Sequence, residues 1–310
     1  PDGQYTFSLC IWGSANVRNW APKVGNLWRT SEDISPRWDR MLHNLDSAAR
    51  RELYAQPGSW NDPDMLFIGT GDFDAAHPVE ARSHFSMWAM LSAPLMIGFD
   101  LRKATPEQLA ILGNRDVIAL NQDPGGHQAV LAYDTDAMQI YVKTLASGEK
   151  AVALFNRTND PIRANLTAAQ MKFMSDHEVK LTDLWTGNEV RFTGETELDI
   201  AKRQTLVFRA SGKRQLAEGM YLSELPGNVF PAADGVTSLQ HDPSIHRGMG
   251  PWTGTRGGGE RPRYAGWGGA RADSSPWGEI LSISGRKFAS GLGVMANSRL
   301  EVRNAGYNRM

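Results

Sequence analysis

The chain has 310 residues, which is enough for two or three domains of about 100–200 residues each. Its 33 lysines and arginines balance 34 aspartates and glutamates, so the formal net charge of -1 gives no electrostatic reason to expect nucleic acid or a membrane surface as a partner. No segment approaches the roughly 18 consecutive apolar residues of a membrane span. A neutral, sugar-like ligand fits this composition best.

The single cysteine, Cys10, excludes an internal disulfide framework and any zinc site built from cysteines. It ends an apolar run that predicts a strand, so we expect a buried and unreactive thiol. The histidines His43, His77 and His84 lack the spacing of a metal site, and we expect them at the surface or hydrogen-bonded in the core. The sequence therefore predicts neither a metal nor an organic cofactor.

Residues 1–123 alternate short apolar runs with longer helical stretches, a pattern typical of βα units. The predicted strands cover residues 5–10, 26–30, 64–68 and 95–99. The predicted helices cover residues 36–51 and 79–92, with a short third helix that a capping box at 105–108 opens and that runs to residue 112. Four such units predict the C-terminal half of a (β/α)8 TIM barrel, with the other half upstream of residue 1.

Beyond residue 123 the pattern changes to short alternating strands separated by turn residues. Residues 124–212 predict an antiparallel β-sandwich, with strands at 138–142, 150–155, 177–183, 189–192 and 205–209. Residues 213–310 form a third block, rich in glycine, proline and tryptophan and including Gly257-Gly258-Gly259. Its last predicted strand covers residues 300–303. The whole fold class is thus α/β followed by all-β.

Polar residues crowd the ends of two apolar segments, at 27–34 and 59–65. The carboxyl ends of the strands hold the active site in a barrel. Cleaving a glycosidic bond requires one carboxylic acid that protonates the departing oxygen and one carboxylate on the other side of the anomeric carbon. Asp33, close to Arg29 at a strand end, can supply one of that pair.

Four segments, at 28–34, 58–65, 93–95 and 116–124, resemble successive motifs of glycoside hydrolase family 27 in order and spacing. This is the α-galactosidase and α-N-acetylgalactosaminidase family. The resemblance implies a (β/α)8 barrel followed by an antiparallel β-domain, and a retaining mechanism without a cofactor. It implies an oligosaccharide or polysaccharide with terminal α-galactosyl groups as substrate, and a secreted or periplasmic location. The third block resembles the NPCBM type of carbohydrate-associated β-sandwich at 221–226 and 288–298.

The resemblance also assigns roles to residues. Asp33 takes the acid/base position, and the attacking aspartate, which follows the fourth barrel strand in this family, would lie upstream of residue 1. The implied substrate-binding residues are Arg29, Asp62, Asp64, Met65, Trp12 and Ile11. Structural alternatives remain open at this stage: Asp33 as a helix N-cap, Asp62 as a turn residue beside a solvated Asp64, and Arg29 as a structural ion-pair partner.

One departure from the family pattern affects the choice of sugar. Where many α-galactosidases of the family have Cys-Glu-Trp, this chain has Cys10-Ile11-Trp12, followed by Gly13 and the small Ser14. The missing carboxylate normally helps to bind a hydroxyl near C2, and a hydrogen bond lost there alters discrimination strongly. We expect an α-galactosidase; an α-N-acetylgalactosaminidase, another pyranosidase of the family and a non-catalytic carbohydrate-binding protein remain alternatives.

Overall fold

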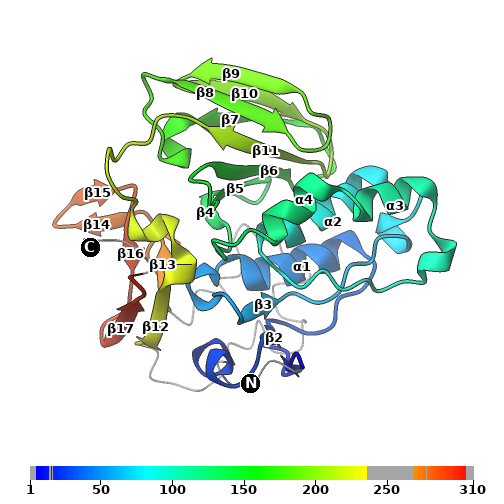
Figure 1. The fold of residues 1–310 in the computed structure, drawn as a ribbon, viewed down its shortest axis with the longest axis horizontal. Helices are drawn as coiled ribbons and strands as arrows, with labels where there is room; N and C mark the ends of the chain where they lie inside the picture. The colour runs from blue at the N-terminus through cyan, green and yellow to red at the C-terminus, as the bar shows by residue number, and fades with distance from the viewer. Residues whose placement is uncertain (1–4, 14, 16, 236–268, 277, 305–310) are drawn as a thin grey trace.

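The computed structural model describes residues 5–13, 15, 17–235, 269–276 and 278–304. These residues form three parts in chain order: an α/β part, an antiparallel sandwich and a smaller β part (Figure 1). Ser14 and the triple glycine at 257–259 lie outside the described residues.

The α/β part contains a parallel sheet in the order β1-β2-β3. Its strands are β1 (Ser8–Leu9), β2 (Leu27–Arg29) and β3 (Trp60–Asp62). Beyond β3, an isolated parallel bridge pairs Leu66 with Ile97. Parallel strands joined by helices are the pattern of a barrel of βα units, so this part is a partial TIM barrel.

The predicted strand at 64–68 is wrong. The strand in this region is β3, which ends at Asp62, and only Leu66 of the predicted range pairs with another chain segment. Pro63 has no N–H to donate, and Asp64 has a left-handed backbone with φ of 84°, so the extended conformation stops there. The predicted strand at 95–99 is likewise reduced to the single bridge at Ile97.

The helices of the α/β part lie together on one side of its sheet (Figure 1). Their bounds are α1 (Trp38–Ala49), α2 (Pro78–Met90), α3 (Pro106–Leu112) and α4 (Arg115–Asn121). The predicted capping box is confirmed, because Thr105 Oγ1 accepts from Gln108 N and Gln108 Oε1 accepts from Thr105 N. Short 3-10 turns fill the connections: η1 (Val17–Asn19), η2 (Ala21–Lys23), η3 (Glu52–Tyr54), η4 (Gly71–Phe73) and η5 (Leu101–Lys103).

The sandwich has a six-stranded antiparallel sheet in the order β4-β5-β6-β11-β8-β9, facing a two-stranded sheet of β7 and β10. Five strands confirm the predictions: β5 (Met138–Thr144), β6 (Lys150–Asn156), β8 (Glu178–Asp183), β9 (Glu189–Thr193) and β11 (Thr205–Ser211). Four elements were not predicted: β4 (Val130–Asp134), β7 (Ile162–Thr167), β10 (Glu195–Ile200) and the 3-10 turn η6 (Ala168–Met171).

The sandwich packs on the helices of the α/β part. Helix α2 lies against β6 and β11, and one buried apolar cluster runs from α1 and α2 into these strands. The ring of Trp38 in α1, for example, meets that of Phe155 in β6 at 5.6 Å between centroids. The first two parts therefore share a core.

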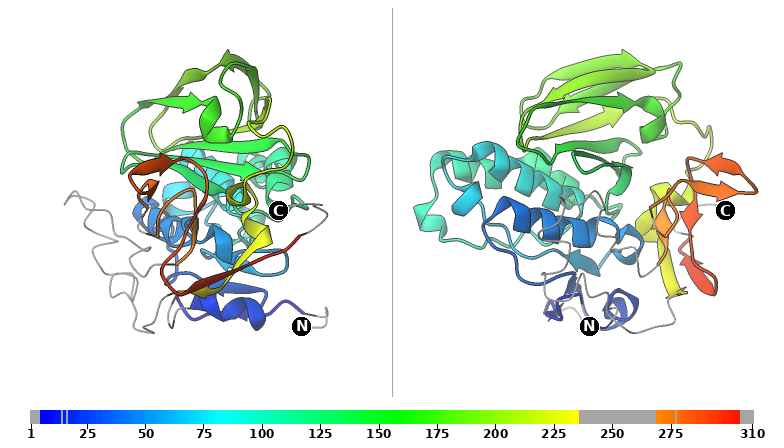
Figure 2. Two further views of the ribbon diagram at one scale, coloured as in Figure 1. Left: turned by 90° about the vertical axis from the view of Figure 1, so that its left-hand side faces the viewer. Right: turned by 180° about the vertical axis from the view of Figure 1, so that it is seen from behind.

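The third part consists of three antiparallel strand pairs, β12-β17, β13-β16 and β14-β15, and lies on one flank (Figures 1 and 2). Its elements are η7 (Leu222–Glu224), η8 (Pro226–Asn228), β12 (Val229–Asp234), β13 (Arg271–Ala272), β14 (Leu281–Ile283), β15 (Arg286–Phe288), β16 (Leu292–Gly293) and β17 (Ser298–Val302). Buried ion pairs attach it to the rest, Lys150 to Glu224 at 2.5 Å and Arg18 to Asp234 at 3.2 Å.

The structure also bears on Cys10 and on membrane-spanning helices. Cys10 is exposed, which corrects the expectation of a buried thiol: β1 is only two residues long, and Cys10 falls beyond its end. Within the described residues, no helix has both the length and the apolar character needed to cross a membrane.

Candidate active site

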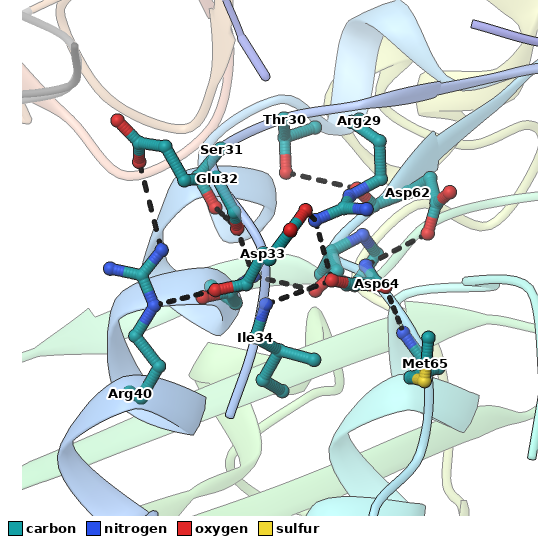
Figure 3. A network of polar contacts seen from close by, with 12 residues as sticks. Arg29, Thr30, Ser31, Glu32, Asp33, Ile34, Arg40, Asp62, Asp64 and Met65 are labelled. Atoms are coloured by element: carbon teal, nitrogen blue, oxygen red, sulfur yellow. Dashed lines mark hydrogen bonds and ion pairs between the residues drawn. The ribbon is translucent and has the colours of Figure 1, made fainter. Parts of the chain in front are cut away.

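The strands β2 and β3 bring two polar segments to one edge of the sheet. Arg29 ends β2 and Asp62 ends β3, and the parallel pairing sets these two residues side by side. The loop after β2 carries Asp33, and the loop after β3 carries Asp64. The carboxyl edge of the partial barrel therefore brings Arg29 together with the carboxylates of Asp33, Asp62 and Asp64 (Figure 3).

Arg29 joins the two loops. Its Nη2 lies 2.5 Å from Asp64 Oδ2 and 3.1 Å from Asp33 Oδ1. The side chain of Arg29 is 10% exposed, whereas that of Asp33 is 76% exposed. The guanidinium is thus anchored by a buried carboxylate and holds an exposed one at the open edge. Asp33 does not cap a helix, since the N-cap residue of α1 is Arg37.

Asp64 is held in a strained backbone conformation by its neighbours. Its Oδ2 accepts from Ile34 N and its Oδ1 from Met65 N, each at 2.8 Å, while its carbonyl accepts from Trp88 Nε1 at 2.6 Å. A left-handed backbone costs a residue with a side chain about 1–2 kcal/mol. These hydrogen bonds offset that cost and fix the direction of the Asp64 carboxylate.

Asp62 shapes the turn beneath this carboxylate. It is buried, and its Oδ1 accepts from Asp64 N at 2.8 Å, which is the hydrogen bond of an Asx turn. Burial raises the pKa of Asp62, opposed by this backbone hydrogen bond and by the charge of Arg29. In the described structure Asp62 therefore acts on Asp64 through the backbone.

Two residues on α1 hold the Asp33 loop and were missed by the sequence analysis. Arg40 Nε donates to the carbonyl of Asp33 at 2.9 Å, and Asn44 Nδ2 donates to the carbonyl of Glu32 at 2.9 Å. Arg40 and Asn44 are four residues apart and so share one helix face. This spacing of polar residues in the predicted helix at 36–51 is the signal by which the sequence could have identified Arg40 and Asn44.

The other predicted substrate-binding residues lie around this network in different ways. Gly13 N donates to the carbonyl of Arg29 at 3.0 Å, so the turn at Trp12 adjoins the end of β2. Trp12 and Met65 are both exposed. Ile11 is half-buried and packs against a small apolar cluster that includes Trp28.

The arrangement can exchange a proton at Asp33 and accept or donate hydrogen bonds to sugar hydroxyls at Arg29 and Asp64. Within the described ranges, no group of three or more histidine, cysteine, aspartate or glutamate side chains is placed to hold a metal ion. The two described cavities, lined in part by Pro57 and Pro124, lie away from this network.

A partial barrel with carboxylates at its strand ends, followed by an antiparallel sandwich, has the architecture of a TIM-barrel glycosidase. Residues 10–123 match the family described as "Alpha galactosidase A", and residues 135–210 match the "Alpha galactosidase C-terminal beta sandwich domain".

The relatives agree with the domain matches. An α-galactosidase of Oryza sativa subsp. japonica is 38% identical over 63% of this chain and 46% of its own length, and α-galactosidase A of Cellvibrio japonicus is 36% identical over 62% and 50%. A solved structure from Bacteroides fragilis is 35% identical, with a TM-score of 0.62 over 68% of this chain and 48% of that one.

The structure of α-galactosidase I from Mortierella vinacea, 23% identical, shares the fold with a TM-score of 0.61 over 67% of this chain and 59% of that one. The matching domain models are both described as α-galactosidase domains, and the two curated relatives are named α-galactosidases. The chain spans about half the length of the curated relatives it matches.

Proposed function

We propose that the protein containing this chain is a retaining glycoside hydrolase that releases terminal α-linked galactose from oligosaccharides or polysaccharides. The observation that carries the proposal is the contact of Arg29 with both Asp33 and Asp64 at the carboxyl ends of neighbouring parallel strands. The relatives named α-galactosidases support the same activity.

In the proposed mechanism, Asp33 works twice. A carboxylate supplied from a part of the protein upstream of this chain attacks the anomeric carbon, while Asp33 protonates the departing glycosidic oxygen. Asp33 then accepts a proton from water as that water attacks the covalent intermediate, so galactose leaves with its anomeric configuration retained.

The neighbours of Asp33 would position it and the sugar. Arg29 and the α1 side chain Arg40 fix the loop on which Asp33 stands, through the Asp33 carboxylate and carbonyl respectively. Asp64 and the exposed Trp12 and Met65 would contact the galactosyl ring, with Asp62 supporting Asp64 from below.

Ile11 favours keeping α-N-acetylgalactosaminidase as a second candidate. Its side chain cannot accept a hydrogen bond from a C2 hydroxyl, and in the structure it packs partly on the apolar cluster at Trp28.

We also propose that the protein is secreted or periplasmic, and that residues 213–310 form an NPCBM-like module. Both proposals are based on the family resemblance. The strand pairs of the third part are compatible with such a module, and its three small sheets would gain their sugar contacts from loops.

An assay of the full-length protein on matched nitrophenyl glycosides tests the proposal. We expect kcat/KM for the α-galactoside to exceed that for the α-N-acetylgalactosaminide and for the β-galactoside. Proton NMR of the first product should show α-galactose. Release of β-galactose would contradict retention, and galactose binding without hydrolysis of any substrate would identify a carbohydrate-binding protein.

A further inference from the structure

A cavity of about 540 Å³ lies where the sandwich, the end of the α/β part and the third part meet. This volume is within the range of about 300–1,000 Å³ that small-molecule sites occupy. Its walls come from His127, from the turn between β5 and β6 at residues 145–148, and from Asn228, Arg214 and Arg303. None of the residues that line it belongs to the Arg29 network.

The lining carries positive charge without a matching negative charge. Arg214 and Arg303 line the cavity, and neither guanidinium has a hydrogen-bond or ion-pair partner among the described residues. The lining includes no aspartate or glutamate. Arginine side chains that face a cavity unpaired favour an anionic ligand, because a guanidinium binds carboxylate and sulfate oxygens with two parallel N–H groups.

Three acidic residues that are adjacent in sequence to residues lining the cavity already have hydrogen-bond partners. Glu224 accepts from Lys150 Nζ at 2.5 Å, and Glu149 accepts from Ser147 Oγ at 3.1 Å. Asp123 accepts from the backbone amides of Gly125 and Ala146 at 2.9 and 3.0 Å. These carboxylates are engaged in hydrogen bonds that fix the walls of the cavity.

The cavity is held open by a fixed frame. His127 is buried, and its Nδ1 accepts from Gly227 N at 3.1 Å across the junction of two parts of the chain. Next to Arg214, Met174 N donates to the carbonyl of Lys213 at 2.7 Å, and Arg303 N donates to the carbonyl of Asn228 at 2.8 Å. A preformed frame lowers the ordering cost of binding.

We propose that this cavity binds a saccharide unit that carries a carboxylate or a sulfate ester. The charge comes from the two arginines, and the lining contains no tryptophan, tyrosine or phenylalanine that could stack on a neutral ring. That the anion is carried on a saccharide rests on the proposed function. The cavity would hold an acidic unit of the same polymer from which the galactosyl group is cleaved.

Calorimetric titration of the full-length protein tests this. The probes are galacturonic acid and galactose 6-sulfate, with inorganic sulfate as the comparison, all in the presence of saturating galactose. We expect one site for each acidic sugar, about tenfold weaker in Arg214→Gln and in Arg303→Gln and absent in the double variant. Added salt should weaken the binding because the contacts are ionic.

Arg299→Gln provides the matched control, since Arg299 stands on β17 close to Arg303 and is exposed as Arg303 is, but it pairs with Glu301 and does not line the cavity. Its binding should equal that of the wild type, and all variants should melt at the wild-type temperature and hydrolyse nitrophenyl galactoside normally. Wild-type binding in the double variant would overturn the proposal. Inorganic sulfate that binds as tightly as galactose 6-sulfate would show that the cavity does not recognise the sugar that carries the anion. Binding that persists in a protein without hydrolase activity would refute the proposed function alone.

Discussion

At the scale of single residues, Arg29 makes two contacts of unequal weight. Its partner Asp64 is buried, whereas its partner Asp33 is exposed, although both oxygens lie within 3.1 Å of the same Nη2. Removing one member of a buried pair costs about 3–5 kcal/mol, while an exposed pair contributes about 0–1 kcal/mol. Breaking the Arg29–Asp64 contact is therefore expected to cost the fold more than breaking the Arg29–Asp33 contact.

This difference predicts the stability of two variants. In the full-length protein, Asp64→Asn should lower the free energy of unfolding by about 3 kcal/mol, because Arg29 stays buried and keeps only the exposed Asp33 as a charged partner. Asp33→Asn should lower it by less than about 1 kcal/mol. Urea unfolding followed by fluorescence measures both, and equal losses would show that the two contacts do not differ in this way.

The place of Arg29 and Asp33 follows from sequence, because they lie at or just after the end of the strand predicted at 26–30. That of Asp62 and Asp64 does not follow from the strand predicted at 64–68, because the strand is β3 and ends at Asp62. Contacts with residues of neighbouring helices and turns could not be predicted from the sequence. His84, expected at the surface or hydrogen-bonded, is buried between Phe73 and Trp88, and neither ring nitrogen has a partner among the described residues. Its residue type alone gives no sign of this packing.

At the scale of elements, the sandwich meets the ends of two helices through Lys143 of β5. Lys143 Nζ donates to the carbonyl of Leu120 near the end of α4 at 2.5 Å and to Ser92 Oγ just beyond α2 at 2.7 Å. The last carbonyls of a helix lack partners within it and carry partial negative charge, so an ammonium group satisfies them. Burial lowers the pKa of Lys143 to about 7.

This pKa predicts how Lys143 contributes to stability across pH. The value falls from 10.5 to about 7 on folding, so between these pH values the unfolded chain holds a proton that the folded chain largely does not. The Lys143 contribution to the unfolding free energy must therefore rise with pH across this window. The stability difference between wild type and Lys143→Met should grow by up to about 1.4 kcal/mol per pH unit.

Urea unfolding at about pH 7.5 and about pH 9.5 measures this difference, within the window that linkage sets. Lys180→Met is the control, because Lys180 is partly exposed and paired with Glu189. Its difference from wild type should change little with pH. An equal change in both variants would mean that burial of Lys143 is not the cause.

Elements with regular patterns were predictable and short or polar ones were not. The strand β6 carries a continuous apolar run at 151–155, and its neighbours β5 and β11 carry shorter runs of three apolar residues that pair with it. The strand β10, Glu-Thr-Glu-Leu-Asp-Ile, has three acidic residues in six and little intrinsic strand preference, so only its pairing with β7 makes it a strand. The strand predicted at 64–68 failed because Pro63 and the turn at Asp64 interrupt it.

At the scale of the whole molecule, the three parts follow one another in the order that the sequence predicts. Their attachment was not predictable, because it depends on residues far apart in the chain. Ala272 N donates to Glu52 Oε1 at 2.7 Å, and Ala270 N donates to Tyr54 Oη at 3.1 Å, each across more than 200 residues. No local pattern signals such contacts.

Apolar side chains stay exposed at, or one residue from, β1 and the bridge at Ile97 in the sheet of the α/β part. Phe7, Met96 and Ile97 are among them. Further barrel strands laid against this sheet would cover such side chains, which supports the proposal that the attacking carboxylate comes from a part of the protein outside this chain.

The central claim is that Asp33 gives and recovers the proton, and the leaving-group dependence of Asp33→Asn tests it most directly. In the full-length protein, kcat/KM should fall by about 10²–10⁴ for an alkyl α-galactoside, whose leaving group needs a proton. It should stay near wild type for a dinitrophenyl α-galactoside, whose leaving group does not, with a burst of phenolate before slow hydrolysis of the intermediate. An equal fall in kcat/KM for both substrates would contradict the acid/base role of Asp33.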